Sequence, residues 1–222
     1  MMNFIVIIQS RMTSRRYPGK MLAPFLGKPV LSHVVDRLKK TKISSQIILA
    51  TSEENSDDPL ATYSNQLGLK VVRGSLDDVM KRFVLCLEHY KCDAFFRVCG
   101  DSPLLLPFLF EHAASIFRKN NFDLVTNIFP RSFPAGMTVE LIRTKTFLEA
   151  QKDIYQSEDR EHITRYFYNN HKKFKIYNIE CANSSYLNLK LAVDNPDDLK
   201  KIEEWHSTQD KNYEDIFPIL SK

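Results

Sequence analysis

A loop rich in basic residues follows the first apolar segment of the chain. Residues 9–20 read QSRMTSRRYPGK, which places Arg11, Arg15, Arg16 and Lys20 close together. A guanidinium group donates hydrogen bonds in a fork that matches phosphate oxygens, and a triphosphate carries several negative charges. The loop therefore predicts a polyphosphate site, with an ordinary solvated basic turn as the alternative. The Gly-x-x-x-x-Gly-Lys-Ser/Thr pattern of a Walker loop is absent.

Two aspartates follow apolar segments further along the chain. Asp101 comes after residues 93–98 through Gly100, and Asp194 comes directly after residues 189–193. Parallel strands end at the same edge of a sheet, so both carboxylates are expected beside the basic loop. Magnesium prefers hard oxygen ligands and often takes one or two carboxylates together with substrate phosphates. The pair therefore predicts a magnesium site, although an aspartate in this position is also a common helix N-cap.

A third set of polar residues is suited to bind a second substrate. Glu140 alternates with Thr138 and Ile142, so it shares one face of a predicted strand with them. Arg160 and His162 lie in a predicted helix. Glu140, Arg160 and His162 could together bind a polyhydroxylated or anionic molecule. The alternatives are a surface ion pair in this helix and a packed histidine, and a role of His162 as a general base is the weaker option.

The elements that position these residues alternate between apolar strands and amphipathic helices. This alternation predicts an α/β fold in which a mostly parallel sheet is covered by helices on both faces. Two prolines and a glycine interrupt it at 129–136, which predicts one domain over 1–222 with an inserted segment at about 128–180. The predicted strands are 4–8, 46–51, 70–73, 93–98, 123–127, 175–179 and 189–193, and the predicted helices are 30–38, 60–67, 77–90, 107–119, 144–153, 157–170 and one that begins near 195.

Composition narrows the classes of function. The chain of 222 residues is 43% hydrophobic and 26% charged with a formal charge of +4, and its basic residues are spread out. We expect no nucleic-acid partner, since such proteins gather basic residues into a patch. The four cysteines form no Cys-x-x-Cys pair, and the N-terminus has no signal-peptide pattern. These features predict a cytoplasmic protein that neither forms disulfides nor associates with a membrane.

Five motifs, in order along nearly the whole chain, resemble one enzyme family. The sequence is similar to the superfamily of CMP-Kdo synthetases and acylneuraminate cytidylyltransferases, particularly its spore-coat-polysaccharide (SpsF-like) branch. The resemblance implies a Rossmann-like nucleotidyltransferase fold with three α/β/α layers and a small inserted subdomain that often forms a homodimer. It also implies magnesium-dependent transfer of CMP from CTP to an acidic sugar, phosphate or phosphonate. The motifs are QSRMTSRRYPGKML at 9–22, RGSLDDV at 73–79, RVCGDSPL at 97–104, REHIT at 160–164 and VDNPDDL at 193–199.

The resemblance also implies roles for individual residues. By the matching positions, the catalytic set is Arg11, Arg16 and Lys20 on the phosphates, with Asp101 and Asp194 on magnesium. Residues expected to contact the nucleotide are Ser10, Arg11, Ser14, Arg16, Lys20, Arg73, Gly74, Ser75, Asp78 and Gly100. The acceptor oxygen would attack the α-phosphorus in line, and pyrophosphate would leave.

Some positions depart from the family pattern. Ser10 and Thr13 stand where alanine and glycine are usual, and Ala135 and Thr138 stand where acidic residues are often found. Two alternatives therefore stay open. One is a glycosyltransferase or a sugar-phosphate nucleotidyltransferase that uses another nucleotide, although the Asp-x-Asp motif of such glycosyltransferases is missing after Gly100. The other is a nucleotide-binding protein without catalytic activity.

Overall fold

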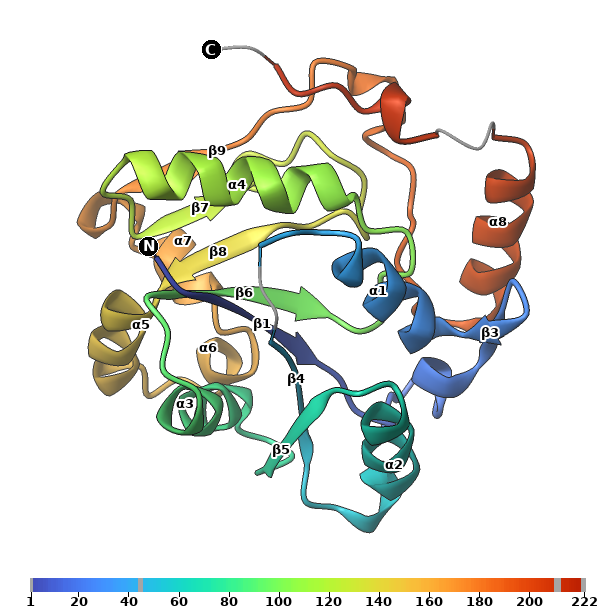
Figure 1. The fold of residues 1–222 in the computed structure, drawn as a ribbon, viewed down its shortest axis with the longest axis horizontal. Coiled ribbons are helices and arrows are strands. Elements are labelled where there is room, and N and C mark those ends of the chain that lie inside the picture. Colours follow the sequence, from blue (N-terminus) through green and yellow to red (C-terminus); the bar gives the residue numbers. More distant parts are fainter. Residues whose placement is uncertain (1, 44–45, 210–212, 221–222) are drawn as a thin grey trace.

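A central sheet organises the computed structural model, which describes residues 2–43, 46–209 and 213–220 (Figure 1). Among these residues the sheet has the strand order β5-β4-β1-β6-β8-β7-β9. Neighbouring strands are parallel except at β6–β8 and β7–β8. The mostly parallel sheet is confirmed. The strands are β1 (Phe4–Gln9), β4 (Ile47–Ser52), β5 (Lys70–Gly74), β6 (Ala94–Cys99), β7 (Leu124–Thr126), β8 (Glu140–Arg143) and β9 (Ile176–Asn178), with a separate hairpin of β2 (Pro24–Phe25) and β3 (Lys28–Pro29).

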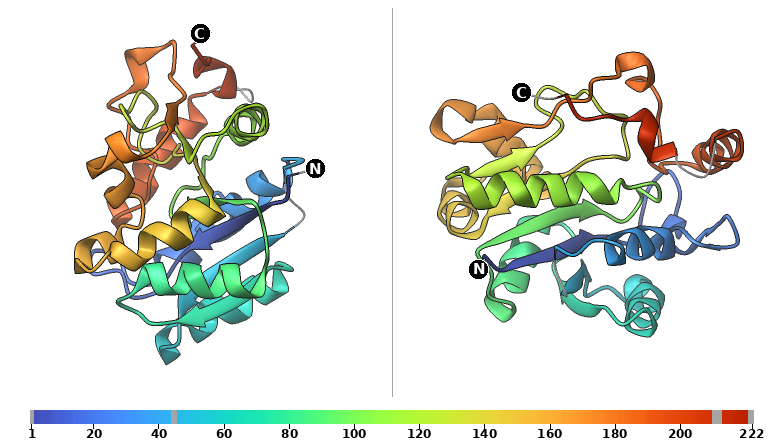
Figure 2. Two further views of the ribbon diagram at one scale, coloured as in Figure 1. Left: turned by 90° about the vertical axis from the view of Figure 1, so that its left-hand side faces the viewer. Right: turned by 45° about the horizontal axis from the view of Figure 1, so that its top comes forward.

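Helices cover both faces of the sheet, as the two views in Figure 2 show. Successive side chains of a strand point to opposite faces. Phe4, Val6 and Ile8 of β1 therefore pack with α1 and α4, whereas Ile5 and Ile7 pack with α3, α5 and α7. This confirms the three-layer α/β/α architecture. The helices are α1 (Val30–Lys39), α2 (Asp58–Gln66), α3 (Val79–His89), α4 (Pro107–Lys119), α5 (Thr144–Ala150), α6 (Ser157–Glu161), α7 (Arg165–Asn169) and α8 (Pro196–Ser207).

Two predicted elements differ from the structure. The helix predicted over 157–170 is divided into α6 and α7, because His162 leaves helical geometry at φ −106° and ψ 72° and Ile163 turns into the core. The strand predicted at 189–193 is wrong as a regular strand. This segment makes only an isolated parallel bridge between Ala135 and Lys190, and Val193 N–H donates to the Asp101 carbonyl.

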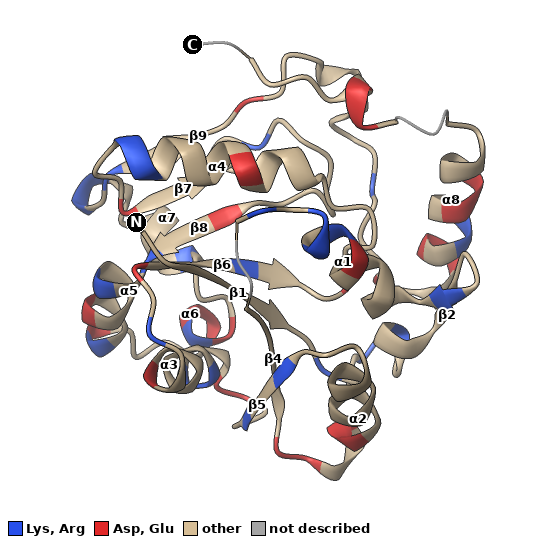
Figure 3. Ribbon diagram, in the orientation of Figure 1, with Lys and Arg blue, Asp and Glu red and all other residues tan. Residues whose placement is uncertain are grey.

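The segment at 128–180 is joined closely to the sheet. Its strand β8 lies between β6 and β7, and β9 forms the sheet edge beside β7. Its helices α5 and α7 pack on the same face as α3. No helix in the described part of the chain is both long and apolar enough to cross a bilayer. Acidic and basic residues are interspersed over the elements around the sheet (Figure 3).

Candidate functional site

A cavity of about 750 Å³ opens where the central parallel strands end. Gln9 at the end of β1 and Cys99 at the end of β6 form its floor. Its other walls are the loop that follows β1, the connection from β5 to α3, and α6 with the turn after it. Ligands of open α/β sheets bind outside the carboxyl ends of the strands, so this cavity is the candidate site.

Backbone geometry folds the basic loop back toward the sheet. Gly19 has a φ of +77°, a left-handed conformation that a residue with a Cβ adopts only with strain. Its N–H donates to the Met12 carbonyl at 2.9 Å, which closes the loop. A short 3₁₀ turn, η1 (Lys20–Leu22), follows and directs Lys20 inward. Arg11, Ser14 and Arg16 line the cavity from this loop, as the basic pattern predicted.

A buried aspartate that the sequence analysis did not identify anchors this loop. Asp57 has no exposed surface, and its carboxylate accepts hydrogen bonds from Met12 N–H, Thr51 Oγ1, and the N–H and Oγ of Ser52. Burial acts to raise the pKa of Asp57, but these hydrogen bonds outweigh burial and lower it. The only sequence signal was an acidic residue shortly after a strand, and Glu53, Glu54 and Asp58 give the same signal.

Lys20 joins the predicted catalytic residues at the centre of the site. Only 6% of Lys20 is exposed, and its Nζ donates to Asp101 Oδ2 at 2.7 Å and to the Val193 carbonyl at 2.6 Å. Asp194 Oδ1 lies 3.6 Å from the same Nζ and 2.9 Å from Arg16. Burial acts to raise the pKa of Asp194, but the neighbouring cations outweigh it and lower the pKa. The structure therefore brings together Arg16, Lys20, Asp101 and Asp194.

The two aspartates have the donor chemistry that magnesium prefers. Both carboxylates face the same ammonium of Lys20, so they lie on one side of the site. No group of three His, Cys, Asp or Glu side chains with metal-binding geometry occurs among residues 2–43, 46–209 and 213–220. A magnesium ion commonly keeps several waters and takes its remaining ligands from substrate phosphates. Two carboxylates beside a phosphate-binding loop fit that requirement.

Gly100 allows a close contact beneath the basic loop. A Cβ on Gly100 would lie 2.7 Å from Ser10 Oγ and 3.0 Å from Ser10 Cβ, closer than such atoms approach. The Ser10 hydroxyl is buried, lines the cavity and has no hydrogen-bond partner in the described part of the molecule. Gly100 thus has a steric role in the wall, while Ser10 offers a free hydroxyl to a ligand.

The predicted nucleotide residues on the connection from β5 to α3 support the cavity wall from outside. Arg73 forms an ion pair with Asp58 and donates to the carbonyls of Ser52 and Glu54. Asp78 caps α3 through the Lys81 N–H. The predicted residues Arg73, Gly74, Ser75 and Asp78 are not among those that line the cavity, which are Leu76, Asp77, Val79 and Arg82 in this region.

Helix α6 is tied to both neighbouring walls by ion pairs. Glu161 accepts from Arg11 at 3.2 Å, and Arg160 donates to Asp78 at 2.6 and 2.8 Å. Glu161 and His162 line the cavity, as predicted for His162. Arg160, predicted to bind the acceptor, is occupied by Asp78 and does not line it. The sequence analysis considered Glu161 only as one partner of a surface ion pair in this helix.

Glu140, also predicted to bind the acceptor, lies outside the cavity lining. Its side chain is fully buried, with one carboxylate oxygen 2.9 Å from Arg97 Nη1 and the other accepting from the Tyr168 hydroxyl at 2.6 Å. Burial raises the pKa of Tyr168, and the adjacent Glu140 raises it further. Alternation along the strand identified the inward face correctly, but could not distinguish a buried ion pair from an open cleft.

Comparison with known proteins places these features in a family context. A family model described as cytidylyltransferase matches residues 5–219. The spore coat polysaccharide biosynthesis protein SpsF of Bacillus subtilis is 26% identical over 209 residues, which cover 91% of this chain and 85% of that protein. The 3-deoxy-manno-octulosonate cytidylyltransferase of Aeromonas salmonicida is 34% identical over 118 residues, or 51% of this chain and 45% of that protein.

The fold has a solved counterpart. A cytidylyltransferase structure from Leptospira borgpetersenii serovar Hardjo-bovis superposes with a TM-score of 0.90 at 28% identity. The match covers 95% of this chain and 89% of that one. The overall fold is therefore shared with that structure over nearly the whole chain.

Proposed function

This chain belongs to the cytidylyltransferase family, and on that basis we propose that it transfers CMP from CTP to a small acidic acceptor and releases pyrophosphate. One observation carries the proposal. The ammonium of Lys20 lies 2.7 Å from Asp101 and 3.6 Å from Asp194 at the end of the basic loop. Asp101 lines the cavity with these cations, and Asp194 is not in the lining but pairs with two of them, Lys20 and Arg16. Cations for a triphosphate together with two nearby carboxylates suit phosphoryl chemistry.

The residues of the chain would act mainly by positioning and charge neutralisation. Arg11, Arg16 and Lys20 would bind the triphosphate, so that its repulsion toward an anionic acceptor is reduced. The acceptor oxygen forms a bond to the α-phosphorus and releases its proton to water. The bond from the α-phosphorus to the bridging oxygen breaks, and that oxygen leaves with pyrophosphate. Lys20 is held rigidly by three oxygens, so it needs little reorganisation during this step.

Magnesium is part of the proposal, and Asp101 and Asp194 are the residues that would hold it. When bound, magnesium supplies a Lewis acid that polarises phosphate oxygens. Each of these carboxylates already lies beside one cation, the ammonium of Lys20. Two negative charges at one place support the proposal that a metal ion binds there as well. Arg16 also pairs with Asp194 and faces the cavity, so it can turn from the carboxylate to a phosphate.

The acceptor is proposed to be an acidic sugar for cell-surface polysaccharide synthesis. SpsF is named for spore coat polysaccharide, and the Aeromonas relative is named for 3-deoxy-manno-octulosonate. His162 and the basic loop supply polar and cationic groups along the cavity for such a molecule. Phosphates and phosphonates share its negative charge and belong in the same screen.

We also propose that the enzyme acts in the cytoplasm as a homodimer through residues 128–180. Within this segment, Tyr155 is 82% exposed, an unusual exposure for a large aromatic side chain and one that a partner subunit could cover. Light scattering should give twice the monomer mass. Replacement of Tyr155 by serine should shift the mass toward the monomer if the side chain lies in the contact.

The central test measures nucleotide binding and pyrophosphate release in the same preparation. CTP with magnesium at about 100 times its dissociation constant should stabilise the fold by about 2.7 kcal/mol, and the other triphosphates should do so less. Adding 3-deoxy-manno-octulosonate or another acidic acceptor should then release pyrophosphate. Asp101→Asn should slow this release roughly 100-fold or more. Asp36→Asn is the control, because Asp36 of α1 forms an exposed ion pair with Lys28 of β3. No stabilisation by any triphosphate would contradict the proposal.

A further inference from the structure

The two carboxylate oxygens of Asp194 have different surroundings. Oδ1 lies 2.9 Å from Arg16 Nη2 and 3.6 Å from Nζ of Lys20, the ammonium that also donates to Asp101. Oδ2 instead lies 2.9 Å from Nζ of Lys190, which is not among the residues that line the cavity. One oxygen of Asp194 therefore faces the predicted catalytic residues, and the other is occupied by a cation from outside the cavity lining.

Lys190 is itself held in place by Asp198. Its Nζ donates to Asp198 Oδ2 at 2.8 Å, so one ammonium bridges two carboxylates. Asp198 is 8% exposed, and the same oxygen accepts from the N–H groups of Asp194 and Asn195 at 2.8 and 3.0 Å. The Asn195 side chain accepts from Asp198 N–H in return, which completes a capping box at the start of α8. Lys190 therefore joins the Asp194 side chain to the helix start that also holds its backbone.

The backbone of the segment 190–194 is fixed although the segment is not a regular strand. Leu191 N–H donates to the Ala135 carbonyl at 2.7 Å, and Val193 N–H donates to the Asp101 carbonyl at 2.9 Å. The segment is thus held against two other parts of the chain. The ion pair with the lysine at its start then decides how the carboxylate at its end is turned.

Magnesium and calcium make different demands on such a carboxylate. Magnesium requires near-ideal octahedral geometry with short bonds, whereas calcium takes more oxygen ligands at longer distances and readily binds both oxygens of one carboxylate. A carboxylate with one oxygen occupied by an ammonium offers a metal ion only its other oxygen. The contact between Lys190 and Asp194 therefore suits magnesium better than calcium.

We infer that Lys190 is a positioning residue that favours magnesium over calcium beside Asp101, because it leaves only Oδ1 of Asp194 to the metal. This inference rests on the proposed function, because it concerns the metal ion of that reaction. Lys190 acts through Asp194 and does not itself contact the substrates. Residues that hydrogen-bond to metal ligands commonly change metal affinity roughly 10- to 100-fold when they are replaced.

The test compares CTP binding with each of the two metal ions by calorimetry. Each ion is used at a concentration that saturates the nucleotide, and we expect wild-type protein to bind CTP more tightly with magnesium. In Lys190→Met the ratio of the two affinities should fall roughly tenfold, because Asp194 can then offer both oxygens to calcium. The ratio separates positioning from charge, since loss of a nearby positive charge favours both divalent ions alike.

Two further variants control for charge and for folding. Lys190→Arg keeps a cation that can donate to both carboxylates, so it should keep the preference for magnesium. Lys200→Met is the matched control, because Lys200 pairs with Glu204 on α8 and both side chains are largely exposed. It should leave the ratio unchanged. The side chain of Lys190 is 41% exposed, so its replacement should leave the fold intact, and a melting curve without nucleotide checks this.

Three results would overturn the inference. The first is a change in CTP affinity in Lys190→Met, or no change, that is equal for the two metal ions. The second is loss of the preference in Lys190→Arg to the same extent as in Lys190→Met. The third is wild-type protein that binds CTP equally well with magnesium and with calcium. Wild-type protein that binds CTP with neither ion would instead contradict the proposed function itself.

Discussion

Lys20 shows how a single buried residue places a positive charge in the site. Its ammonium is nearly inaccessible to solvent and is shared between Asp101 and Asp194. Lys20→Met should slow pyrophosphate release roughly 100- to 1,000-fold, because a fixed positive charge next to the phosphates is lost. The free energy of unfolding should fall by about 1–3 kcal/mol, since the carbonyl of Val193 loses its buried donor.

The control for this substitution is Lys28→Met. Lys28 also pairs with an aspartate, but both side chains of that pair are largely exposed. Exposed pairs contribute little, so the free energy of unfolding should change by less than about 0.5 kcal/mol and activity should be retained. Undiminished activity in Lys20→Met would show that the phosphates are bound without this lysine.

Asp57 gives a prediction about pH. Its pKa is lowered below the ordinary value of 3.8, because hydrogen bonds from Ser52, Met12 and Thr51 outweigh burial. A lowered pKa in the folded state adds stability that is complete above the ordinary value and disappears as pH falls through the folded value. Asp57→Asn cannot titrate, so its deficit relative to wild type should be largest near neutral pH and shrink below pH 3.8. Urea unfolding across this range measures the deficit, and one that grows on acidification would contradict the prediction.

The secondary structure elements show what apolar periodicity predicts and what it leaves out. The strands β1, β4 and β6 were predicted because they read as largely apolar runs, as strands buried on both faces do. The strand β5 was also predicted, although it is a partly exposed edge strand. The extended segment before Asp194 reads similarly, yet it makes only a bridge to Ala135. Whether an extended segment joins a sheet depends on the strand that lies beside it in the fold. The sequence of the segment itself does not contain that information. The hairpin of β2 and β3 was missed because it is very short.

The same reasoning explains which site residues were found. Arg11, Arg16, Lys20, Asp101 and Asp194 were identified because charged residues that follow apolar segments are visible in the sequence. The role of Asp57 depends on four donors from three other residues, and the orientation of Arg82 depends on the carbonyls of Ser75 and Leu76. Such contacts arise only when the loops fold.

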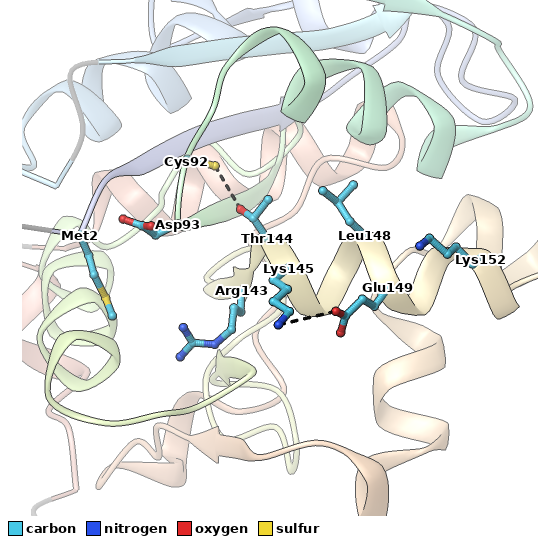
Figure 4. A pocket seen from close by; sticks show the side chains of 9 residues that line it. All are labelled: Met2, Cys92, Asp93, Arg143, Thr144, Lys145, Leu148, Glu149 and Lys152. Atoms are coloured by element: carbon cyan, nitrogen blue, oxygen red, sulfur yellow. Dashed lines mark hydrogen bonds and ion pairs between the residues drawn. The ribbon is translucent and has the colours of Figure 1, made fainter.

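Helix α6 leads to a prediction about nucleotide affinity. Glu161 binds Arg11 in the ligand-free protein, so a triphosphate must compete with this carboxylate. Glu161→Gln should bind CTP more tightly by up to about fivefold, a limit set by the 0.2–1 kcal/mol of a partly exposed pair. Glu149→Gln on α5 is the control, because Glu149 pairs with Lys145 beside a separate cavity that Met2 and Asp93 also line (Figure 4). Calorimetry measures both, and weaker CTP binding in Glu161→Gln would show that Glu161 helps to bind the substrate.

At the scale of the whole molecule, the sheet consists of two parts that meet between β6 and β8. The strands β5, β4, β1 and β6 are parallel, and β8 runs against β6 to begin the second part. An internal ion pair crosses this boundary, because Arg97 of β6 contacts Glu140 of β8 at 2.9 Å. Tyr168 of α7 donates to the same carboxylate. The network therefore connects the parallel strands to a helix of the 128–180 segment.

Breaking this network should destabilise the whole chain more than it disturbs the site. Glu140→Gln or Arg97→Met alone leaves a buried charge without its partner, which costs about 3–5 kcal/mol of unfolding free energy. The double variant removes both charges, so its loss should be smaller than the sum by about 1–3 kcal/mol. Urea unfolding of the four proteins measures this coupling. CTP should still raise the melting temperature of each folded variant, because Arg97 and Glu140 do not line the cavity. The opposite outcome is that the losses of unfolding free energy in the two single variants add in the double variant and that acceptor binding is abolished. That outcome would show that Glu140 binds the acceptor, as the sequence analysis predicted.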